Sequence, residues 1–333
     1  MLLEVKNLKT EFKLKRGVIR AVDDVSFHIE EGEILAIVGE SGSGKSVTSL
    51  SIMGLLQKPG RIAGGEIIYK SRDLNKLSRK ELEDIRGNQI SMIFQEPMTS
   101  LNPVWRIKDQ IMESIITHMK VSKQEALKRT IEMLDTVGIP SAAQRANDYP
   151  HQMSGGMRQR VMTAMALACD PDLLIADEPT TALDVTIQAQ ILELLYQMRE
   201  KFHMAVLLIT HDLGVVAEAA DRVLVMYCGK IVEEADVKSL FARPMHPYTR
   251  GLMKSIPQID DESGERLYMI KGMVPDPLRM PAGCPFSDRC DCRMERCIRE
   301  MPELREIDGH KVRCFLYEEN AEEEAGDGGE DAK

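Results

Sequence analysis

The sequence predicts an α/β fold with a largely parallel central sheet, followed by a small, irregular, cysteine-rich region. Three observations support this prediction. Short apolar runs alternate with helical stretches over the first 255 or so residues, and a glycine-rich loop joins one such pair. Five of the seven cysteines gather between residues 284 and 314. With 333 residues, 43% of them hydrophobic, the chain can bury a sizeable core.

The apolar runs and the stretches between them predict the order of strands and helices. Buried strands are expected at residues 33–38, 90–94, 173–176, 205–210 and 222–226. Helices are expected at residues 46–56, 123–137, 157–168 and 186–202. Shorter runs at residues 2–5, 9–14 and 25–29 favour antiparallel strands. Residues 97–149 contain no convincing buried strand and are interpreted as a mostly helical insertion.

Composition divides the chain into three expected parts. Residues 1–255 form the main domain, with 97–149 inserted as a helical subdomain, and 256–317 form the cysteine-rich domain. Residues 318–333 hold eight acidic residues and one lysine, so we expect a disordered acidic tail. Since the tail carries most of the net charge of −10, the body is close to neutral in net charge, and no basic footprint indicates nucleic acid.

No segment of the sequence predicts a membrane span or a secretory signal. Residues 1–20 are charged throughout and have no apolar core. The longest apolar runs have the length of strands and fall well short of the roughly 20 residues that cross a bilayer. We therefore expect a soluble, intracellular chain whose membrane role, if it has one, works through a partner.

The glycine-rich loop at residues 39–46 reads GESGSGKS and fits the phosphate-binding pattern G-x-x-x-x-G-K-[ST] in full. Glycines let backbone N–H groups turn inward, where they and the following helix form a nest for phosphate oxygens. Lys45 is expected to pair with the β- and γ-phosphates, and the Ser46 hydroxyl to ligate Mg²⁺. The other expected nucleotide contacts are Gly39, Ser41, Gly42, Ser43, Gly44 and Val47. Because an expected strand precedes this loop and an expected helix follows it, the alternative of a flexible Gly/Ser hinge is disfavoured.

A second acidic motif follows the apolar run at residues 173–176. Asp177 is expected to hold the Mg²⁺ shell, and Glu178 to orient or deprotonate the attacking water. The alternative is that both carboxylates simply solvate the end of a strand. Two adjacent carboxylates at that point, followed by Pro179, favour catalysis.

Between these motifs, residues 153–160 read MSGGMRQR, just before the strand that ends at Asp177. This arrangement resembles the ATP-binding cassette family over residues 1 to about 255. In that family two cassettes enclose two ATP molecules head to tail. The resemblance implies a P-loop cassette fold in which Ser154, Gly155 and Gly156 reach the γ-phosphate bound by the other subunit.

The same resemblance implies roles for four further residues. Gln95 matches the glutamine that contacts Mg²⁺ and the attacking water, and His211 matches the histidine that contacts the γ-phosphate. Asp184 ends a loop, residues 181–184, that matches the segment coupling the two sites. Phe12 stands where the family has an aromatic side chain that stacks on adenine.

The cysteine-rich end has the composition of a metal site. Gaps of 5, 1, 4 and 16 residues separate five thiols: Cys284, Cys290, Cys292, Cys297 and Cys314. Thiolates suit both Zn²⁺ and iron–sulfur clusters. Neither the common zinc-module spacing nor the ferredoxin spacings fit, so spacing alone leaves the metal open.

The sequence around these cysteines resembles the C-terminal extension of dipeptide and oligopeptide importer ATPases. The matching segments read HPYTRGL at 246–252, GCPF at 283–286, RC at 289–290 and HKVRC at 310–314. The resemblance implies a [4Fe-4S] cluster, with Cys292 as a spare thiol. Its implied ligands are Cys284, Cys290, Cys297 and Cys314. A Zn²⁺ staple or free thiols remain the alternatives.

Together the resemblances imply an ATP-binding and ATP-hydrolysing subunit of a dipeptide or oligopeptide importer, peripheral on the cytoplasmic face of the inner membrane. The implied partners are two membrane-spanning permease subunits and a second, paralogous ATPase or another copy of this chain. An extracytoplasmic solute-binding protein acts indirectly. Alternatives are import of nickel or another small solute, a soluble cassette ATPase of DNA repair or translation, and a non-catalytic redox sensor.

Overall fold

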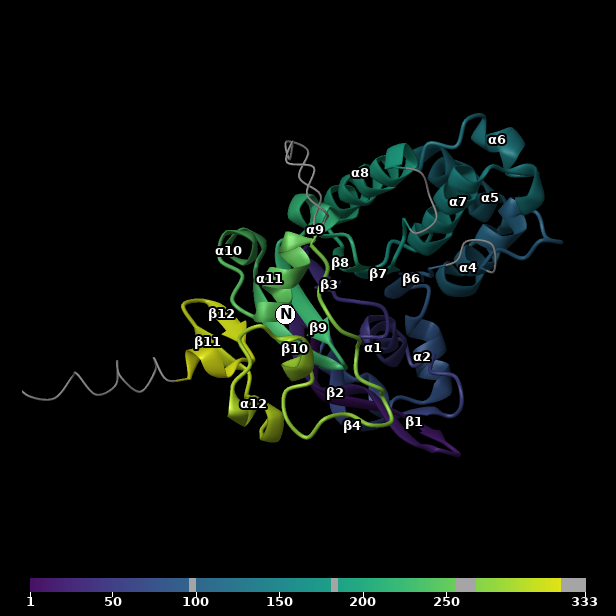
Figure 1. Cartoon of the computed structure of the whole chain (residues 1–333). Coiled ribbons are helices and arrows are strands. Elements are labelled where there is room, and N and C mark those ends of the chain that lie inside the picture. The colour runs from purple at the N-terminus through teal and green to yellow at the C-terminus, as the bar shows by residue number, and fades with distance from the viewer. Residues whose placement is uncertain (96–99, 181–184, 256–267, 319–333) are drawn as a thin grey trace, which may run out of the picture.

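The computed structural model describes residues 1–95, 100–180, 185–255 and 268–318, which form two sheets with helices around them. An eight-stranded sheet has the order β11-β12-β10-β9-β3-β8-β7-β6, and a four-stranded sheet has the order β2-β1-β4-β5. Figure 1 shows the helices α4 to α7 set well apart from the four-stranded sheet, with the larger sheet between them. The α/β class predicted from the sequence is confirmed.

The five predicted buried strands form the parallel centre of the larger sheet. They are β3 (Ile34–Val38), β6 (Ile90–Ile93), β7 (Leu173–Asp177), β8 (Ala205–Thr210) and β9 (Arg222–Tyr227). Every residue of β3, β7 and β8 is buried, as expected for parallel strands covered on both faces. Because parallel strands share one carboxyl edge, the segments that follow β3, β6, β7 and β8 all lie along that edge.

The antiparallel sheet is larger than the sequence predicted. Its strands are β1 (Leu3–Leu14), β2 (Gly17–Ile29), β4 (Gly60–Tyr69) and β5 (Arg72–Asp73). The runs predicted at 2–5 and 9–14 are one continuous strand, β1, whose pairing with β2 shifts register between Val5 and Glu11. These irregularities break the strict alternation of apolar and polar residues, which is why one strand had the appearance of two.

Helices cover the sheet and also form a separate group beyond β6. The helices that cover the sheet are α1 (Lys45–Ile52), α2 (Arg79–Ile85), α8 (Val185–Phe202), α9 (Leu213–Ala219), α10 (Val237–Ala242) and α11 (Pro247–Lys254). The helices of the separate group are α4 (Ile107–Met119), α5 (Lys123–Thr136), α6 (Ala142–Arg145) and α7 (Gly155–Leu167). In α4, Ile107, Ile111 and Ile115 are fully buried at four-residue spacing and face the other helices of this group. The structure describes no strand between residues 100 and 149.

The C-terminal region continues the larger sheet. Strand β12 (His310–Val312) pairs with β10 (Lys230–Asp236), and β11 (Arg305–Ile307) pairs with β12. The helix α12 (Glu295–Arg299) and a short 3-10 turn, Ser287–Arg289, connect the cysteines. The Phe286 ring packs against the rings of Tyr227 and Tyr248, with centroids 5.3 and 5.4 Å apart. The cysteine-rich region therefore shares its core with the main part of the chain.

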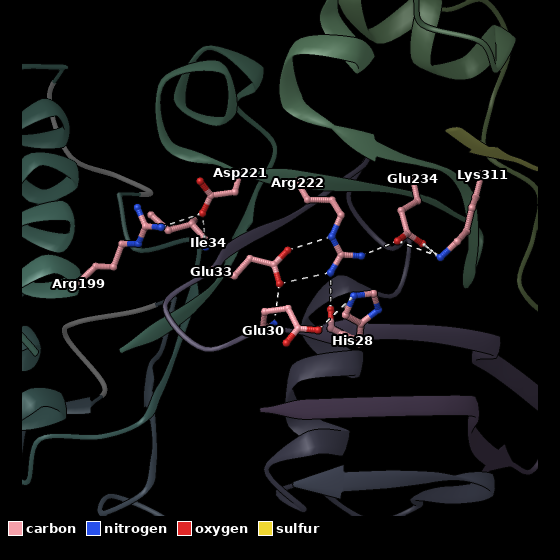
Figure 2. Close-up of polar contacts among 9 residues, drawn as sticks. All are labelled: His28, Glu30, Glu33, Ile34, Arg199, Asp221, Arg222, Glu234 and Lys311. Atoms are coloured by element: carbon pink, nitrogen blue, oxygen red, sulfur yellow. Dashed lines mark hydrogen bonds and ion pairs between the residues drawn. The ribbon is translucent and has the colours of Figure 1, made fainter. Parts of the chain in front are cut away.

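Arg222, at the start of β9, forms hydrogen bonds with the end of β2, with the residue before β3 and with β10 (Figure 2). Its guanidinium donates to Glu33 at 2.9 Å, to the carbonyl oxygen of His28 at 2.6 Å, and to Glu234. Glu234 also accepts from Lys311 of the C-terminal strand at 3.2 Å. The side chains of Arg222, Glu33 and Glu234 are 16%, 12% and 5% exposed, so these charges are largely withdrawn from water.

Two expectations from the sequence concern membrane-spanning segments and the acidic tail. Across the described ranges, the structure has no helix with the length and apolar character needed to cross a bilayer. The predicted acidic tail, apart from its first residue, lies outside the described residues. That first residue, Glu318, accepts a hydrogen bond from Arg296 at 2.7 Å and so belongs to the folded part of the chain.

Candidate nucleotide site

The glycine-rich loop follows the carboxyl end of β3 and leads directly into α1, the setting that a phosphate nest needs. Gly39 and Gly44 have φ values of 154° and 106°. A Cβ atom at Gly39 would lie 2.2 Å from the carbonyl oxygen of Met226, and one at Gly44 would lie 2.4 Å from that of Ala21. Only glycine fits at these two positions, because both the backbone conformation and the close approach exclude a side chain.

Two buried polar groups in this loop are suited to phosphate. The Lys45 ammonium donates to the carbonyl oxygens of Gly39 and Glu40, at 2.7 and 3.0 Å. Burial lowers the pKa of Lys45, and the carboxylates of Glu178, Asp177 and Glu40 oppose that shift. Within the described part of the chain, the buried Ser43 hydroxyl has no hydrogen-bond partner. Buried hydroxyls are normally satisfied, so Ser43 has a donor available for a phosphate oxygen.

The two main residues predicted to hold Mg²⁺ are in contact. The Ser46 hydroxyl at the start of α1 donates to Asp177 at the end of β7, at 3.0 Å. Burial raises the pKa of Asp177 to about 6; the bond from Ser46 lowers it and nearby Glu178 raises it further. A hydroxyl and a buried carboxylate side by side are ligands that Mg²⁺ accepts, so the residues present fit the ion.

Glu178 lies at the centre of the three predicted catalytic residues. The Gln95 side-chain amide donates to one carboxylate oxygen at 2.8 Å, and His211 Nδ1 lies 3.5 Å from the other. Glu178 has a φ of 47°, a left-handed backbone conformation that costs energy for a non-glycine residue. Such strain is typical of functional positions. The structure thus brings Gln95, Glu178 and His211 together from the ends of three different strands.

The remaining predicted nucleotide contacts lie apart from this group. Ser154 caps α7 by accepting from the backbone N–H of Met157 at 3.3 Å, and Ser154 and Gly155 are exposed. Figure 1 shows α7 well separated from α1. Phe12 lies on β1, where its ring contacts Gly60 of β4. The coupling loop, with Asp184, falls outside the described residues.

The raised pKa of Asp177 predicts a pH-dependent gain of stability in Asp177→Asn without Mg²⁺ and nucleotide. The folded state disfavours the charged carboxylate, so the penalty is complete above about pH 6 and disappears below the ordinary pKa of 3.8. A shift of about two units corresponds to about 2–3 kcal/mol. We expect the variant to melt at a higher temperature at pH 8 and the difference to shrink towards pH 5.

The measurement is thermal unfolding of both proteins from pH 8 to pH 5, with EDTA present. Asp135→Asn, which changes an exposed carboxylate, is the matched control. A difference in melting temperature that stays constant over this range would show that the Asp177 charge is not penalised by burial.

Sequence reasoning missed the side chains that hold the first half of the phosphate loop. The Tyr248 hydroxyl accepts from the backbone N–H of Glu40 at 2.8 Å. The Glu40 carboxylate receives two hydrogen bonds from Arg289, at 2.7 and 2.9 Å. Both partners come from the C-terminal third of the chain, where no spacing signal connects them to residues 39–46.

The predicted cluster ligands line one small cavity of about 20 Å³. Cys284, Cys290, Cys297 and Cys314 surround it together with the exposed Cys292, and Phe286 and His246 close it. Burial raises the pKa of Cys290 to about 11 and that of Cys314 to about 12, so both are thiols in the metal-free protein. Within the described residues, no three His, Cys, Asp or Glu side chains are grouped as ligands of one metal ion.

The fold and the site together define a P-loop nucleotide-binding protein of the cassette type. Residues 22–181 match the family described as "ABC transporter", and residues 232–297 match "Oligopeptide/dipeptide transporter, C-terminal region". The oligopeptide transport ATP-binding protein AppD of Bacillus subtilis is 57% identical, over 97% of this chain and 99% of its own. The chain belongs to the ATP-binding cassette family of transporter ATPases.

Other relatives and solved structures agree with this assignment. The dipeptide transport ATP-binding protein DppD of Bacillus subtilis is 53% identical over 96% of both chains. A solved dimer of the cassette MJ0796 in a post-hydrolysis state, bound to ADP and Pi, is 31% identical with a TM-score of 0.64. That comparison covers 71% of this chain and 99% of the other, so the shared cassette accounts for most but not all of this chain.

Proposed function

We propose that this protein is the ATP-hydrolysing subunit of an importer of dipeptides or oligopeptides. The observation that carries the ATPase assignment is the convergence of Gln95 and His211 on Glu178, beside the contact between Ser46 and Asp177. The names of the relatives and the matched C-terminal region support peptides as the cargo and do not favour nickel.

In the proposed reaction, Ser46 and Asp177 would hold Mg²⁺, which would supply positive charge that offsets the charge of the phosphates. Glu178 accepts the proton of the attacking water, and Gln95 orients the carboxylate by donating to it at 2.8 Å. His211 is 63% exposed, which leaves its ring accessible to the γ-phosphate at the surface. Lys45 exchanges its two carbonyl partners for phosphate oxygens.

The proposed assembly pairs this chain with a second cassette, preferably a paralogous one. In a single chain His211 is exposed, and Ser154 and Gly155 are exposed at the start of α7, a helix that lies apart from α1 (Figure 1). In a head-to-tail pair, Ser154 and Gly155 of one cassette would cover the phosphate loop and His211 of the other. The resulting site stabilises phosphate charge from both sides, and hydrolysis removes the bridging γ-phosphate and lets the pair separate.

A groove of about 520 Å³ is the proposed docking surface for the membrane-spanning partners on the cytoplasmic face of the membrane. It lies between β6 and the helices α4 and α7, and Met53, Met92, Phe94, Met162 and Met165 contribute apolar walls. Phe94 is 40% exposed and directly precedes Gln95. A partner that contacts Phe94 in this groove would therefore touch the residue next to the catalytic Gln95.

The test is reconstitution of the full chain with its permease subunits, second ATPase and solute-binding protein in proteoliposomes. We expect ATP hydrolysis to rise when a peptide-loaded binding protein is added, and labelled peptide to accumulate inside only with Mg-ATP. Uptake of Ni²⁺ but not of peptides would overturn the proposed cargo. Hydrolysis that is indifferent to the membrane subunits would overturn the transport role.

We further propose that Cys284, Cys290, Cys297 and Cys314 hold the [4Fe-4S] cluster. All four line one cavity, which supports a shared ligand, although the described residues include no three His, Cys, Asp or Glu side chains grouped for a metal ion of either kind. A cavity of about 20 Å³ has room for little more than one water, so the cluster fits only if the surrounding loops widen. Iron, sulfide and zinc analysis of anaerobically purified protein decides between the two metals.

A further inference from the structure

The phosphate loop contains one carboxylate, and that carboxylate stands close to the place where a polyanion must bind. Glu40 is the second residue of the loop, and its backbone carbonyl oxygen accepts from Lys45 at 3.0 Å. Its side chain is 27% exposed, so water screens the charge only in part. An unpaired negative charge at this position would repel the phosphates of a bound nucleotide.

Arg289 neutralises this carboxylate from the other end of the sequence. Its two terminal nitrogens donate to the two Glu40 oxygens at 2.7 and 2.9 Å, the paired geometry that arginine alone provides. The Arg289 side chain is only 5% exposed. Because the guanidinium is buried and donates two hydrogen bonds to Glu40, this ion pair differs from an exposed pair on the surface.

The rest of the Arg289 side chain is fixed as well. The guanidinium also donates to the carbonyl oxygens of Lys271 and Ile270, at 3.0 and 3.4 Å, and to the Tyr227 hydroxyl at 3.2 Å. With the two bonds to Glu40, these contacts use all five N–H donors of the guanidinium. Arg289 is therefore held in one orientation before any nucleotide binds.

The backbone of the loop is held on the same side. The Tyr248 hydroxyl accepts from the Glu40 N–H at 2.8 Å, and the Tyr227 and Tyr248 rings pack 4.7 Å apart. The 3-10 turn Ser287–Arg289 joins this group directly to Cys290, which lines the cysteine cavity. Arg289 of the cysteine-rich region thus contacts the Glu40 charge, and Tyr248 of α11 contacts the Glu40 backbone from the same side.

We infer that Arg289 is a positioning residue for nucleotide binding: it cancels the Glu40 charge and fixes the phosphate loop from the cysteine-rich region. This inference rests on the proposed ATPase function. It makes the C-terminal region part of the machinery that sets nucleotide affinity, in addition to any role in holding a metal.

The test is the dissociation constant of Mg-ATP, measured by calorimetry on the full chain. We expect Arg289→Gln to weaken binding about 10- to 100-fold, because Glu40 then repels the phosphates, and to do so most at low ionic strength. Glu40→Gln should bind Mg-ATP at least as tightly as the wild type, since it leaves the positive charge of Arg289 without the carboxylate that cancels it. Arg289→Lys should lie between, because lysine keeps the charge but not the paired geometry.

The double variant Glu40→Gln/Arg289→Gln separates charge cancellation from simple support of the fold. We expect its affinity to return to near the wild-type value, because the local charge is zero in both proteins, whereas a purely structural role predicts that it stays as weak as Arg289→Gln. It also decides the question if Arg289→Gln alone fails to fold, because it buries no unpaired charge. Arg293→Gln, which changes an exposed arginine of the same region, is the matched control.

Two results would overturn the inference. One is an Arg289→Gln protein that folds and binds Mg-ATP as tightly as the wild type at low salt. The other is a double variant that gains nothing over Arg289→Gln. Failure of the wild-type chain to bind Mg-ATP in the same titration would instead remove the proposed function on which the inference rests.

Discussion

Replacing Glu178 by glutamine is expected to lower the rate of ATP hydrolysis about 100- to 10,000-fold, the range for loss of a general base. Glutamine keeps the size of the side chain but cannot accept the proton of the attacking water. Binding of Mg-ATP should be retained, since Lys45, Ser46 and Asp177 are unchanged. The variant should therefore accumulate as an ATP-bound pair of cassettes, detected by size-exclusion chromatography and by bound-nucleotide analysis.

The control for this result is Glu193→Gln, which changes an exposed glutamate on α8 that accepts from Gln197 at 2.9 Å. Its hydrolysis rate should equal that of the wild type. If Glu178→Gln turns over at the wild-type rate, Glu178 is not the base. If it hydrolyses slowly but never holds ATP in a pair of cassettes, the two-cassette arrangement is wrong.

Replacing Arg222 by methionine is expected to reduce the free energy of unfolding by about 3–5 kcal/mol, the usual loss when one partner of a buried ion pair is removed. Glu33 would lose its two bonds from Arg222, and Glu234 would keep only Lys311. The His28 carbonyl oxygen would lose its donor as well (Figure 2). Urea denaturation of the nucleotide-free chain measures the change as a lower midpoint.

Two further variants make this prediction specific. Arg79→Met removes a highly exposed arginine that pairs with Glu83, and surface pairs of this kind contribute little, so its midpoint should barely move. Arg222→Met/Glu33→Gln should recover part of the lost stability, because Glu33 is then neutral and only Glu234 remains as a carboxylate that has lost its bond from Arg222. A midpoint for Arg222→Met equal to that of Arg79→Met would show that this network does not stabilise the fold.

The parallel core could be predicted from the sequence because its strands are short, fully apolar and separated by helices. The strand predicted at residues 205–210 has the same bounds in the structure, and β7 extends its prediction by one residue, Asp177. The antiparallel strands were predicted less well. Strand β4 (Gly60–Tyr69) contains three glycines and several exposed residues, so it lacks the apolar run that identified the others.

In the hydrolytic part of the site, Asp177 and Glu178 could be predicted because they directly follow an apolar strand, whereas the roles of Gln95 and His211 were implied only by the resemblance to the cassette family. All four stand at or after the ends of strands, and the topology of a parallel sheet brings such positions to one edge. The contacts of Arg289 with Glu40 and of Arg222 with Glu33 and Glu234 were not predictable. They join charged residues far apart in sequence, and no local pattern distinguishes an arginine that will be buried from one that remains in water.

The pairing of β12 with β10 has a practical consequence for anyone who would shorten this chain. Removing everything after residue 255 would take away β12 and leave the edge of β10 without its strand partner at Glu233 and Glu234. Such an uncovered margin is a template for strands of other molecules. A trimmed version consisting only of the ATPase portion would tend to aggregate, so biochemical work is best done with the C-terminal region in place.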